Sequence, residues 1–425
     1  GRNEDEGVMA AVTVAKTIGS TGVFSTVQLW EDGAPASLTM AEKSGCTTFL
    51  VATFAQGESL NFVGSGATGV MLDTDSTGVG TGTYMTYGIT AGNPATADVI
   101  TGVTSTATCV LTSGTPDNVG VVWQGQCQNQ TFTVAGTVLT VSGSTNSATA
   151  YKELTTAASA SFVDAFGTNP HTELRYNTAN GAALNGTATN TNTVFLNETG
   201  TVKFNKLQVT GSGTDGRAII AGGATAVVQD CIFDGRFSLT TVGAGVAACG
   251  NTVTWINCLI IQRASAADHI FSCATSSPTL RNCANVASDD LATAPTTLLT
   301  STSTGTWTIS NCALFAGDST KAITSGTATF NFTTCYSDIS GTTGVTQTSF
   351  PGEYFSVSDA AGDYRLQDLA KQINTGTTDG AVPNDIMGIA RPQGASYDVG
   401  PWEDIDAPFP FVAPFCQMHN SGKMI

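Results

Sequence analysis

Small and apolar residues recur at a regular spacing through residues 201–338. They anchor six repeats that follow one another at intervals of 23 to 29 residues. The anchors are Leu207, Cys231, Cys258, Cys283, Cys312 and Cys335. The residues three and five places before every anchor are apolar, and so is the residue two places after most of them. A self-similar period of this length is typical of a solenoid, in which each repeat is one structural unit stacked on the next.

The parity of these positions predicts a corner inside each repeat. The residues five and three places before an anchor face one side of a strand, whereas the anchor and the residue two places after it face the other. A straight strand cannot bury both sets. The residue directly before the anchor is therefore expected to turn the chain, and Asn and Asp adopt the left-handed conformation of such a turn readily. The predicted corner residues are Asp230, Asn257, Asn282, Asn311 and Thr334.

Strand, corner, strand and variable loop together predict an all-β parallel β-helix with ladders of like residues along a dry interior. The expected segments are an N-terminal cap (1–60), a small β-hairpin insert (61–120), the parallel β-helix (121–345), a C-terminal capping module (346–403) and a Pro/Phe-rich tail (404–425). The alternative is an antiparallel sandwich in which the Asn-Cys pairs are coincidental, because chains rich in Ser and Thr are also common among sandwiches.

The composition narrows the classes of function. Only 12% of the 425 residues are charged, and the net charge is −17, so the basic surface that nucleic acids need is not expected. No apolar run is long enough to span a bilayer, and residues 1–15 lack the apolar core of a signal peptide. Either a leader was removed before Gly1, or the native start is Met9. We expect no nucleic-acid partner, no membrane insertion and no cofactor.

Five of the 11 cysteines occupy the anchor position: Cys231, Cys258, Cys283, Cys312 and Cys335. Stacked strands lie ~4.8 Å apart, so these thiols should form a buried ladder of small apolar groups. Disulfides are the alternative. A metal site is a weaker interpretation, because the sequence has no Cys-x-x-Cys and its three histidines are scattered.

Two segments carry a resemblance to a known family. Residues 18–32 (Ile-Gly-Ser-Thr-Gly-Val-Phe-Ser-Thr-Val-Gln-Leu-Trp-Glu-Asp) resemble the opening that caps right-handed parallel β-helix repeat proteins, except that Val23 replaces the usual Arg-Asp. Residues 363–374 and 388–403 resemble their terminal module, with several departures. Thr/Gly hairpins like those of residues 61–112 are familiar in virion proteins of tailed bacteriophages. The resemblance implies a right-handed parallel β-helix. Within the module, Arg391 is expected to pair with Asp398 or Glu403, and Trp402 to close the last repeat.

Enzymatic residues are less evident. Glycoside hydrolysis needs two carboxylates across the scissile bond, and the weak candidates are Asp289, Asp290 and Asp234. A structural role is an alternative for each of them: Asp289 and Asp290 are adjacent and are typical of a solvated loop, and Asp234 beside Arg236 is typical of a surface ion pair. No Gly-x-Ser-x-Gly elbow accompanies a histidine. The sequence identifies no reaction.

The expected function is that of a non-enzymatic component of a phage virion (spike, fibre or capsid decoration), assembled in the host cytoplasm and presented on the extracellular particle. One alternative is a tailspike-type receptor-binding glycan depolymerase, and another is a secreted bacterial adhesin. The expected partners are other virion proteins, further copies in a homo-oligomer (a trimer by analogy with phage spikes) and a host surface glycan. Phe409, Phe411 and Phe415, set among prolines, are the expected oligomer contacts because an exposed apolar arm usually marks an interface.

Overall fold

The computed structural model shows a nearly all-β protein. It describes residues 12–34, 38, 41–50, 53–55, 57–74, 84–112, 117–164, 174–188, 192–211, 217–221, 225–235, 247–249, 252–262, 271–273, 277–287, 297–302, 304–350, 352–356, 362–367 and 369–404. The candidates Asp289 and Asp290, and the tail residues Phe409, Phe411 and Phe415, lie outside these ranges. Within them, no helix is long and apolar enough to cross a membrane.

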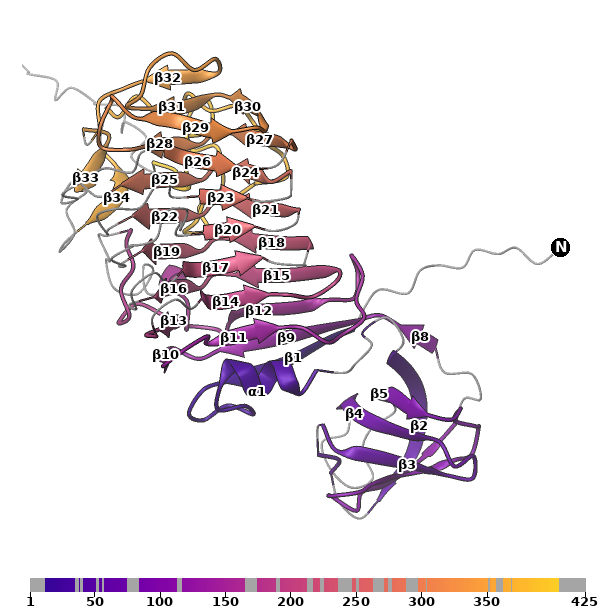
Figure 1. The fold of residues 1–425 in the computed structure, drawn as a ribbon. Coiled ribbons are helices and arrows are strands. Elements are labelled where there is room, and N and C mark those ends of the chain that lie inside the picture. The colour runs from indigo at the N-terminus through magenta and orange to yellow at the C-terminus, as the bar shows by residue number, and fades with distance from the viewer. Residues whose placement is uncertain are drawn as a thin grey trace, which may run out of the picture.

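Three parallel sheets wind into a β-helix whose turns stack along one axis (Figure 1). The first sheet contains β1 (Val12–Ile18), β9 (Val121–Cys127), β12 (Lys152–Thr156), β15 (Thr201–Asn205), β18 (Thr225–Gln229), β21 (Val253–Ile256), β24 (Thr279–Arg281), β27 (Thr306–Ser310) and β30 (Thr329–Thr333). The second contains β10 (Thr131–Val134), β13 (Ala183–Gly186), β16 (Gln208–Gly211), β19 (Ile232–Gly235), β22 (Leu259–Gln262), β25 (Ala284–Ala287), β28 (Ala313–Phe315), β31 (Cys335–Ser337) and β32 (Val345–Gln347). The third contains β11 (Leu139–Val141), β14 (Asn192–Leu196), β17 (Arg217–Ala221), β20 (Ala247–Cys249), β23 (Phe271–Cys273), β26 (Thr297–Ser301) and β29 (Ala322–Gly326). The predicted fold class is confirmed.

One residue makes the corner between the first and second sheets. The φ angle is 50° at Asp230, 50° at Asn257, 49° at Asn282 and 50° at Asn311, all in the left-handed region. Lys206 and Thr334 adopt the same conformation, at 58° and 52°. The corner lets residues of opposite parity face the same interior, so Trp255 before it and Cys258 after it belong to one core.

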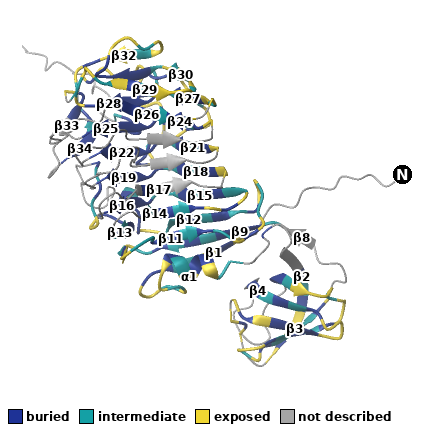
Figure 2. Ribbon diagram, viewed as in Figure 1, coloured by how far each residue is buried: buried dark blue, intermediate teal, exposed yellow. Residues whose placement is uncertain are grey.

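The interior of the β-helix is a single apolar core. Trp255, Trp307 and Phe233 are fully buried in it, and Figure 2 shows buried residues continuing from turn to turn along the stacked strands. Burying a large apolar side chain contributes roughly 1.5–3 kcal/mol relative to exposing it. Each turn contacts only its neighbours, so stability is approximately a sum over turns, and the end turns, which have one neighbour each, need separate protection.

The opening segment closes the first turn. Strand β1 pairs in parallel with β9, and helix α1 (Val27–Asp32) follows, capped by the Thr26 hydroxyl, which accepts from the Leu29 N–H at 3.1 Å. Val27 and Trp30 of the helix are 1% exposed and join the interior core. Figure 1 shows α1 lying against the first strands. The segment that resembles the family opening therefore covers an end that would otherwise expose the core.

A buried ion-pair network fastens α1 to the strands. The Lys152 Nζ lies 2.6 Å from Glu31 Oε1 and 2.9 Å from Glu198 Oε2, and it donates a hydrogen bond to the Ser142 carbonyl at 2.7 Å. Lys152 and Glu198 are each 1% exposed, and Glu31 is 6% exposed. Two carboxylates therefore share one ammonium group in a site from which water is largely excluded.

The C-terminal module packs along the outer face of the second sheet. Outward side chains of that sheet, such as Ile232 and Leu259, form a second apolar cluster with Tyr364, Ile386 and Trp402. The module contains β33 (Tyr354–Ser356) and β34 (Asp363–Leu366), which pair antiparallel. Trp402, expected to close the last repeat, lies instead in this cluster on the flank, because the outward apolar residues of several turns need a cover.

Polar contacts fix the module against the corners. The Asn257 side-chain amide donates to the Asn384 carbonyl at 2.7 Å, and that of Asn311 donates to the Thr377 carbonyl at 2.7 Å. Within the module, buried Arg391 lies 3.5 Å from Glu403 Oε2 and donates to the Asp398 carbonyl at 3.0 Å. Of the two expected partners, Glu403 thus supplies the carboxylate, and Asp398 contributes its backbone.

A separate antiparallel sheet is inserted between β1 and β9. Its strands are β2 (Ala41–Leu50), β3 (Ser59–Val63), β4 (Thr68–Thr74), β5 (Tyr84–Ala91), β6 (Val99–Gly102), β7 (Thr108–Leu111) and β8 (Asp117–Val119). The order is β5-β4-β3-β6-β7-β2-β8, and β2 also pairs with β5. The strands therefore close around a small core of their own that includes Phe62 and Tyr87. Strand β2 belongs to this unit and not to the cap in which the sequence placed it.

Candidate functional site

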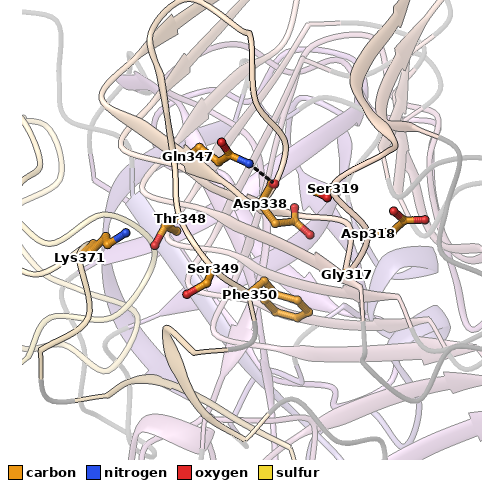
Figure 3. Close-up of a pocket in the computed structure, with 9 residues that line it drawn as sticks. All are labelled: Gly317, Asp318, Ser319, Asp338, Gln347, Thr348, Ser349, Phe350 and Lys371. Carbon is orange, nitrogen blue, oxygen red and sulfur yellow. Dashed lines mark hydrogen bonds between the residues drawn. The ribbon is translucent and has the colours of Figure 1, made fainter.

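An open pocket of about 640 Å³ lies beside the last turns of the β-helix. Its lining residues, drawn in Figure 3, are Gly317, Asp318, Ser319, Asp338, Gln347, Thr348, Ser349, Phe350 and Lys371. We call it the acidic pocket because it contains two carboxylates and one ammonium group. Its size is within the range of small-molecule and oligosaccharide sites, roughly 300–1,000 Å³.

The fold brings these residues together through the strands of the second sheet. Residues 317–319 follow β28, Asp338 follows β31, and residues 348–350 follow β32. Consecutive parallel strands end at the same edge of their sheet, so the loops that follow them stack beside one another. Lys371 comes from the C-terminal module, and Figure 3 shows it across the pocket from Asp318. The pocket therefore exists only where the module meets the last turns.

Asp318 is held in its ionised form. One carboxylate oxygen accepts hydrogen bonds from the Thr320 hydroxyl at 2.7 Å and the Thr320 N–H at 2.9 Å, and the other lies 3.6 Å from the Lys321 ammonium group. These bonds, that of the Thr320 hydroxyl foremost, lower the pKa of Asp318. The group faces solvent, and it presents a fixed negative charge at the rim.

Asp338 has the opposite environment. It is 7% exposed, and burial raises the pKa of its carboxyl, although a hydrogen bond from the Ala316 N–H at 3.0 Å opposes the shift. The Gln347 amide donates to the Asp338 carbonyl at 3.2 Å and so ties β32 to the residue after β31 (Figure 3). Asp338 therefore keeps a proton to a higher pH than Asp318 does.

The floor of the pocket is rigid. Phe350 stacks on Phe315, with ring centroids 5.1 Å apart and planes at 19°. Below the rim, Glu353 is 3% exposed. It accepts a hydrogen bond from the Thr348 hydroxyl and another from the Lys371 N–H at 2.6 Å. Buried Glu353 thus connects the residues that follow β32 with the residues of the C-terminal module on the other side of the pocket.

The arrangement suits a polyhydroxylated ligand. Carboxylates accept hydrogen bonds from hydroxyl groups, an ammonium group donates them, and an aromatic ring offers an apolar face. Two carboxyls whose pKa values are displaced in opposite directions are also what glycoside hydrolysis needs, one protonated as the acid and one ionised. For metals the result is different: nowhere in the described ranges are three or more His, Cys, Asp or Glu side chains grouped as ligands.

The anchor cysteines form a column in the interior. Cys231, Cys258, Cys283, Cys312 and Cys335 are each 0% exposed, and every cysteine whose side chain the structure describes is a free thiol. The thiols donate to backbone carbonyls, as from Cys258 to Ile256 at 3.3 Å. Burial raises the pKa of Cys258 and of Cys312. A protonated, enclosed thiol is a packing group and a poor nucleophile.

The sequence candidate Asp234 is fully buried in β19. It lines neither the acidic pocket nor the smaller cavity described next, and it does not lie at the surface, where the sequence had placed it beside Arg236. A carboxylate that is fully buried is not accessible to a substrate. Asp289 and Asp290 lie outside the described residues.

A small cavity of about 100 Å³ separates the module from the corner column. Lys206, Asp230 and Asp385 are among its lining residues. Burial raises the pKa of Asp230 to about 6, against hydrogen bonds from Asn257 and Gln229, and it raises the pKa of Asp385 to about 6. The cavity is an interface between two parts of one chain, and its carboxyls act on stability.

The sequence analysis missed Asp318, Asp338 and Lys371. Asp338 stands three residues after the anchor Cys335, the same offset at which Asp234 follows Cys231. One repeat position is therefore enclosed at β19 and opens onto the pocket after β31. The offset was visible in the sequence, but the difference in exposure was not, because it depends on which turn the module covers.

Comparisons with known proteins add little to this geometry. No protein-family model matches the chain, and no curated protein matches it. Among solved structures, the crystal structure of pectate lyase Pel9A aligns with a TM-score of 0.32 at 11% identity, covering 67% of this chain and 88% of that one. A likeness this weak carries no argument about activity, and the fold rests on the strand pairing itself.

Proposed function

We propose that this chain is a structural component of a tailed-bacteriophage virion, a spike, fibre or capsid decoration that presents a β-helix at the particle surface. Support comes from two segments that resemble right-handed parallel β-helix repeat proteins and from the Thr/Gly-rich insert of residues 61–112, which resembles hairpins of tailed-phage virion proteins. The opening supplies β1 and α1, which cover the first turn. The terminal module supplies the flank cover that Arg391 and Glu403 hold together. The opening caps the first turn, as the resemblance implies, whereas the terminal module covers the outer face of the second sheet.

The physical character of the chain supports a surface role. The solenoid buries large apolar side chains and thiols in a core that continues from turn to turn, and this burial stabilises the stacked turns. The proposed partners are other virion proteins, further copies of the chain in a homo-oligomer, for which a trimer is favoured, and a host surface glycan. The proposed location is the extracellular particle.

The test is to look for the chain on particles. Antibodies raised against the purified protein should decorate intact virions in electron micrographs, and peptides from the chain should appear at constant stoichiometry in mass spectra of gradient-purified particles. Serum depleted on the purified protein is the control. A chain found only in infected cells, or only in the culture medium, would refute the virion proposal.

The acidic pocket favours a second candidate, a tailspike-type receptor-binding glycan depolymerase. In this proposal Asp338 is the proton donor and Asp318 the ionised partner, because their pKa values are displaced in opposite directions. Loss of a general acid lowers a rate by about 10²–10⁴-fold. Asp338→Asn should therefore abolish the release of reducing ends from host surface polysaccharide while binding persists.

The control for this test is Asp379→Asn, which removes a carboxylate lying 3.4 Å from Arg281, outside the pocket. Binding is followed by calorimetry with the same polysaccharide. Binding without cleavage, abolished by Lys371→Ala, would leave a receptor-binding role only. Absence of any binding by the unaltered protein would exclude the glycan proposal and leave the virion proposal standing.

A further inference from the structure

The antiparallel insert is built from two copies of one unit. Residues 58–71 read Glu-Ser-Leu-Asn-Phe-Val-Gly-Ser-Gly-Ala-Thr-Gly-Val-Met, and residues 98–111, 40 positions later, read Asp-Val-Ile-Thr-Gly-Val-Thr-Ser-Thr-Ala-Thr-Cys-Val-Leu. Exchanging β2, β3 and β4 for β5, β6 and β7 leaves every pairing among these six strands unchanged. The insert therefore has an internal two-fold axis, which passes between the antiparallel neighbours β3 and β6.

Each half of the insert holds a turn of the other half. The Glu58 carboxylate accepts hydrogen bonds from the Ser105 N–H at 2.9 Å and from the Ser105 hydroxyl at 2.7 Å. At the equivalent place, the Asp98 carboxylate accepts from the Ser65 N–H at 2.9 Å and from the Ser65 hydroxyl. Glu58 is 6% exposed and Asp98 is 3% exposed. The two carboxylates of the repeated unit are thus bound to its turns, and neither charge lies on the outer surface.

The outer face of β4, β3, β6 and β7 is accessible and uncharged. Alternate residues of these strands point into the core of the insert, and the others point outward. Strand pairing arranges the outward side chains in three rows: Val63, Val99 and Val110; then Asn61, Thr68, Thr101 and Thr108; then Ser59, Val70 and Val103. Val63 is 61% exposed, and its two-fold equivalent Val103 is 55% exposed. A polar row therefore lies between two rows that contain valines.

The pattern of this face matches a second copy of itself. In a two-fold dimer the same patch of both subunits forms the contact, so the patch must be complementary to itself. Turning one copy over about an axis parallel to the strands places Val63 of each copy against Val99 of the other, and Asn61 against Thr101. Sheets that pack face to face keep their strands within about 30° of each other. Apolar rows can therefore lie on apolar rows, and the polar row on the polar row.

Charge also favours a contact between like chains at this face. The chain has a net charge of −17, so two copies repel each other in general. The three rows contain no Asp, Glu, Lys or Arg. A contact made through them places no carboxylate against another and buries no unpaired charge, which would be costly. A strongly basic partner, by contrast, would find no carboxylate to bind among these side chains.

We propose that two copies of this chain associate through the outer faces of their inserts, related by a two-fold axis. The valines of the outer rows are buried in the contact, and the hydroxyl and amide groups of the middle rows hydrogen-bond across it. The three rows hold fewer residues than the roughly 20–30 that each partner contributes to a standard interface, so the association depends on concentration. It is separate from the three-fold association proposed above, and it does not depend on the virion proposal, because it is a property of the purified chain.

Sedimentation of the full chain over a range of concentrations tests the proposal. Val63→Asp combined with Val103→Asp places a carboxylate in each outer row and should raise the dissociation constant at least about tenfold, because the contact would then bury unpaired charges. The matched control is Val23→Asp. Val23 is 60% exposed and lies outside the insert, between β1 and α1, so this variant should associate as the unaltered chain does. A chain that does not associate at any concentration overturns the proposal, and so does an equal effect of the control and the double variant.

Opposite charges show whether the two faces meet each other. Val63→Lys combined with Val103→Lys should also weaken self-association. An equal mixture of the Asp and Lys double variants should associate again, because opposite charges then face each other across the contact. Recovery in the mixture also shows that both variants are folded. A mixture that associates no more strongly than either variant alone, with thermal unfolding of both variants like that of the unaltered chain, overturns the proposal.

Discussion

Replacing Lys152 by methionine tests how the first turn is held. The substitution keeps the length of the side chain and removes the charge that Glu31 and Glu198 share at 2.6 and 2.9 Å. Both carboxylates would remain almost fully buried and unpaired. Breaking a buried pair by removing one partner costs about 3–5 kcal/mol. The cost should fall on the first turn and α1, because a solenoid loses stability locally.

The assay is native-state hydrogen exchange at Trp30 and along β1. Each 1.4 kcal/mol is a factor of ten, so a cost of about 3–5 kcal/mol should speed exchange there by about 10²- to 4 × 10³-fold in Lys152→Met and leave β27 unaffected. Lys203→Met is the matched control. It removes a lysine of the same sheet whose ammonium group donates to the Tyr151 hydroxyl at 2.7 Å but is only partly buried. Its cost should stay below about 1 kcal/mol.

A triple variant separates charge from packing. Lys152→Met combined with Glu31→Gln and Glu198→Gln leaves no buried charge in the network, and it should recover most of the lost protection, since a neutral replacement of a buried ion pair is often tolerated. Unchanged exchange at Trp30 in Lys152→Met would refute the reasoning. So would a triple variant as weak as the single one, because the defect would then lie in packing.

Three further results are expected. Burial raises the pKa of Asp230, Asp385 and Asp398 to about 6, above the ordinary 3.8. The folded state therefore binds their protons more tightly than the unfolded state does, and the free energy of unfolding in urea should rise as the pH falls from 6 toward 4. A decrease over that pH range would contradict the raised pKa values. Thr334→Asn relieves a β-branched residue at φ 52° and should raise the free energy of unfolding by about 1 kcal/mol in urea titrations, whereas a loss would mean that its hydroxyl contact matters more. Thiol reagents should modify Cys258 only in urea, and rapid labelling of the native protein would disprove its burial.

The interior could be predicted from the sequence because every turn repeats one local rule. Trp255 and Cys258 differ in parity, and a single left-handed residue between them, Asn257, reconciles the two. That rule depends on residues within a few positions of one another. Spacing and residue type are therefore enough to predict the corner in each repeat, and the six imperfect repeats support the same prediction.

The outer cover could not be predicted in the same way. Ile232 and Leu259, one place after their anchors, are apolar and point away from the interior, which indicates that some segment must cover them. The covering segment is far away in the sequence: Asn257 and Asn384, which share a hydrogen bond, are 127 residues apart. No periodicity links the outward residues to the covering segment. The sequence therefore predicts that the C-terminal module exists, but not where it packs on the β-helix.

The acidic pocket could not be predicted for two reasons: its loops follow no repeat pattern, and the docking position of the module was unknown. Asp318 and Asp338 lie in loops after consecutive strands of the second sheet, where length varies from turn to turn and no repeat pattern applies. Lys371 comes from the module, whose position was unknown. A site of this kind emerges only when the stacking of turns and the docking of the module are both given, and single carboxylates in Thr- and Gly-rich loops give no signal beforehand.

The corner asparagines combine one property that the sequence predicts with one that it does not. Glycine would satisfy the left-handed backbone at Asn257 and Asn311 at least as well as asparagine does. Asparagine also supplies the amides that bond to the Asn384 and Thr377 carbonyls. The turn depends on the residue alone and can be inferred from its type. The hydrogen bond depends on a segment that is distant in the sequence. The asparagine therefore predicts its own backbone conformation but not its hydrogen-bond partner.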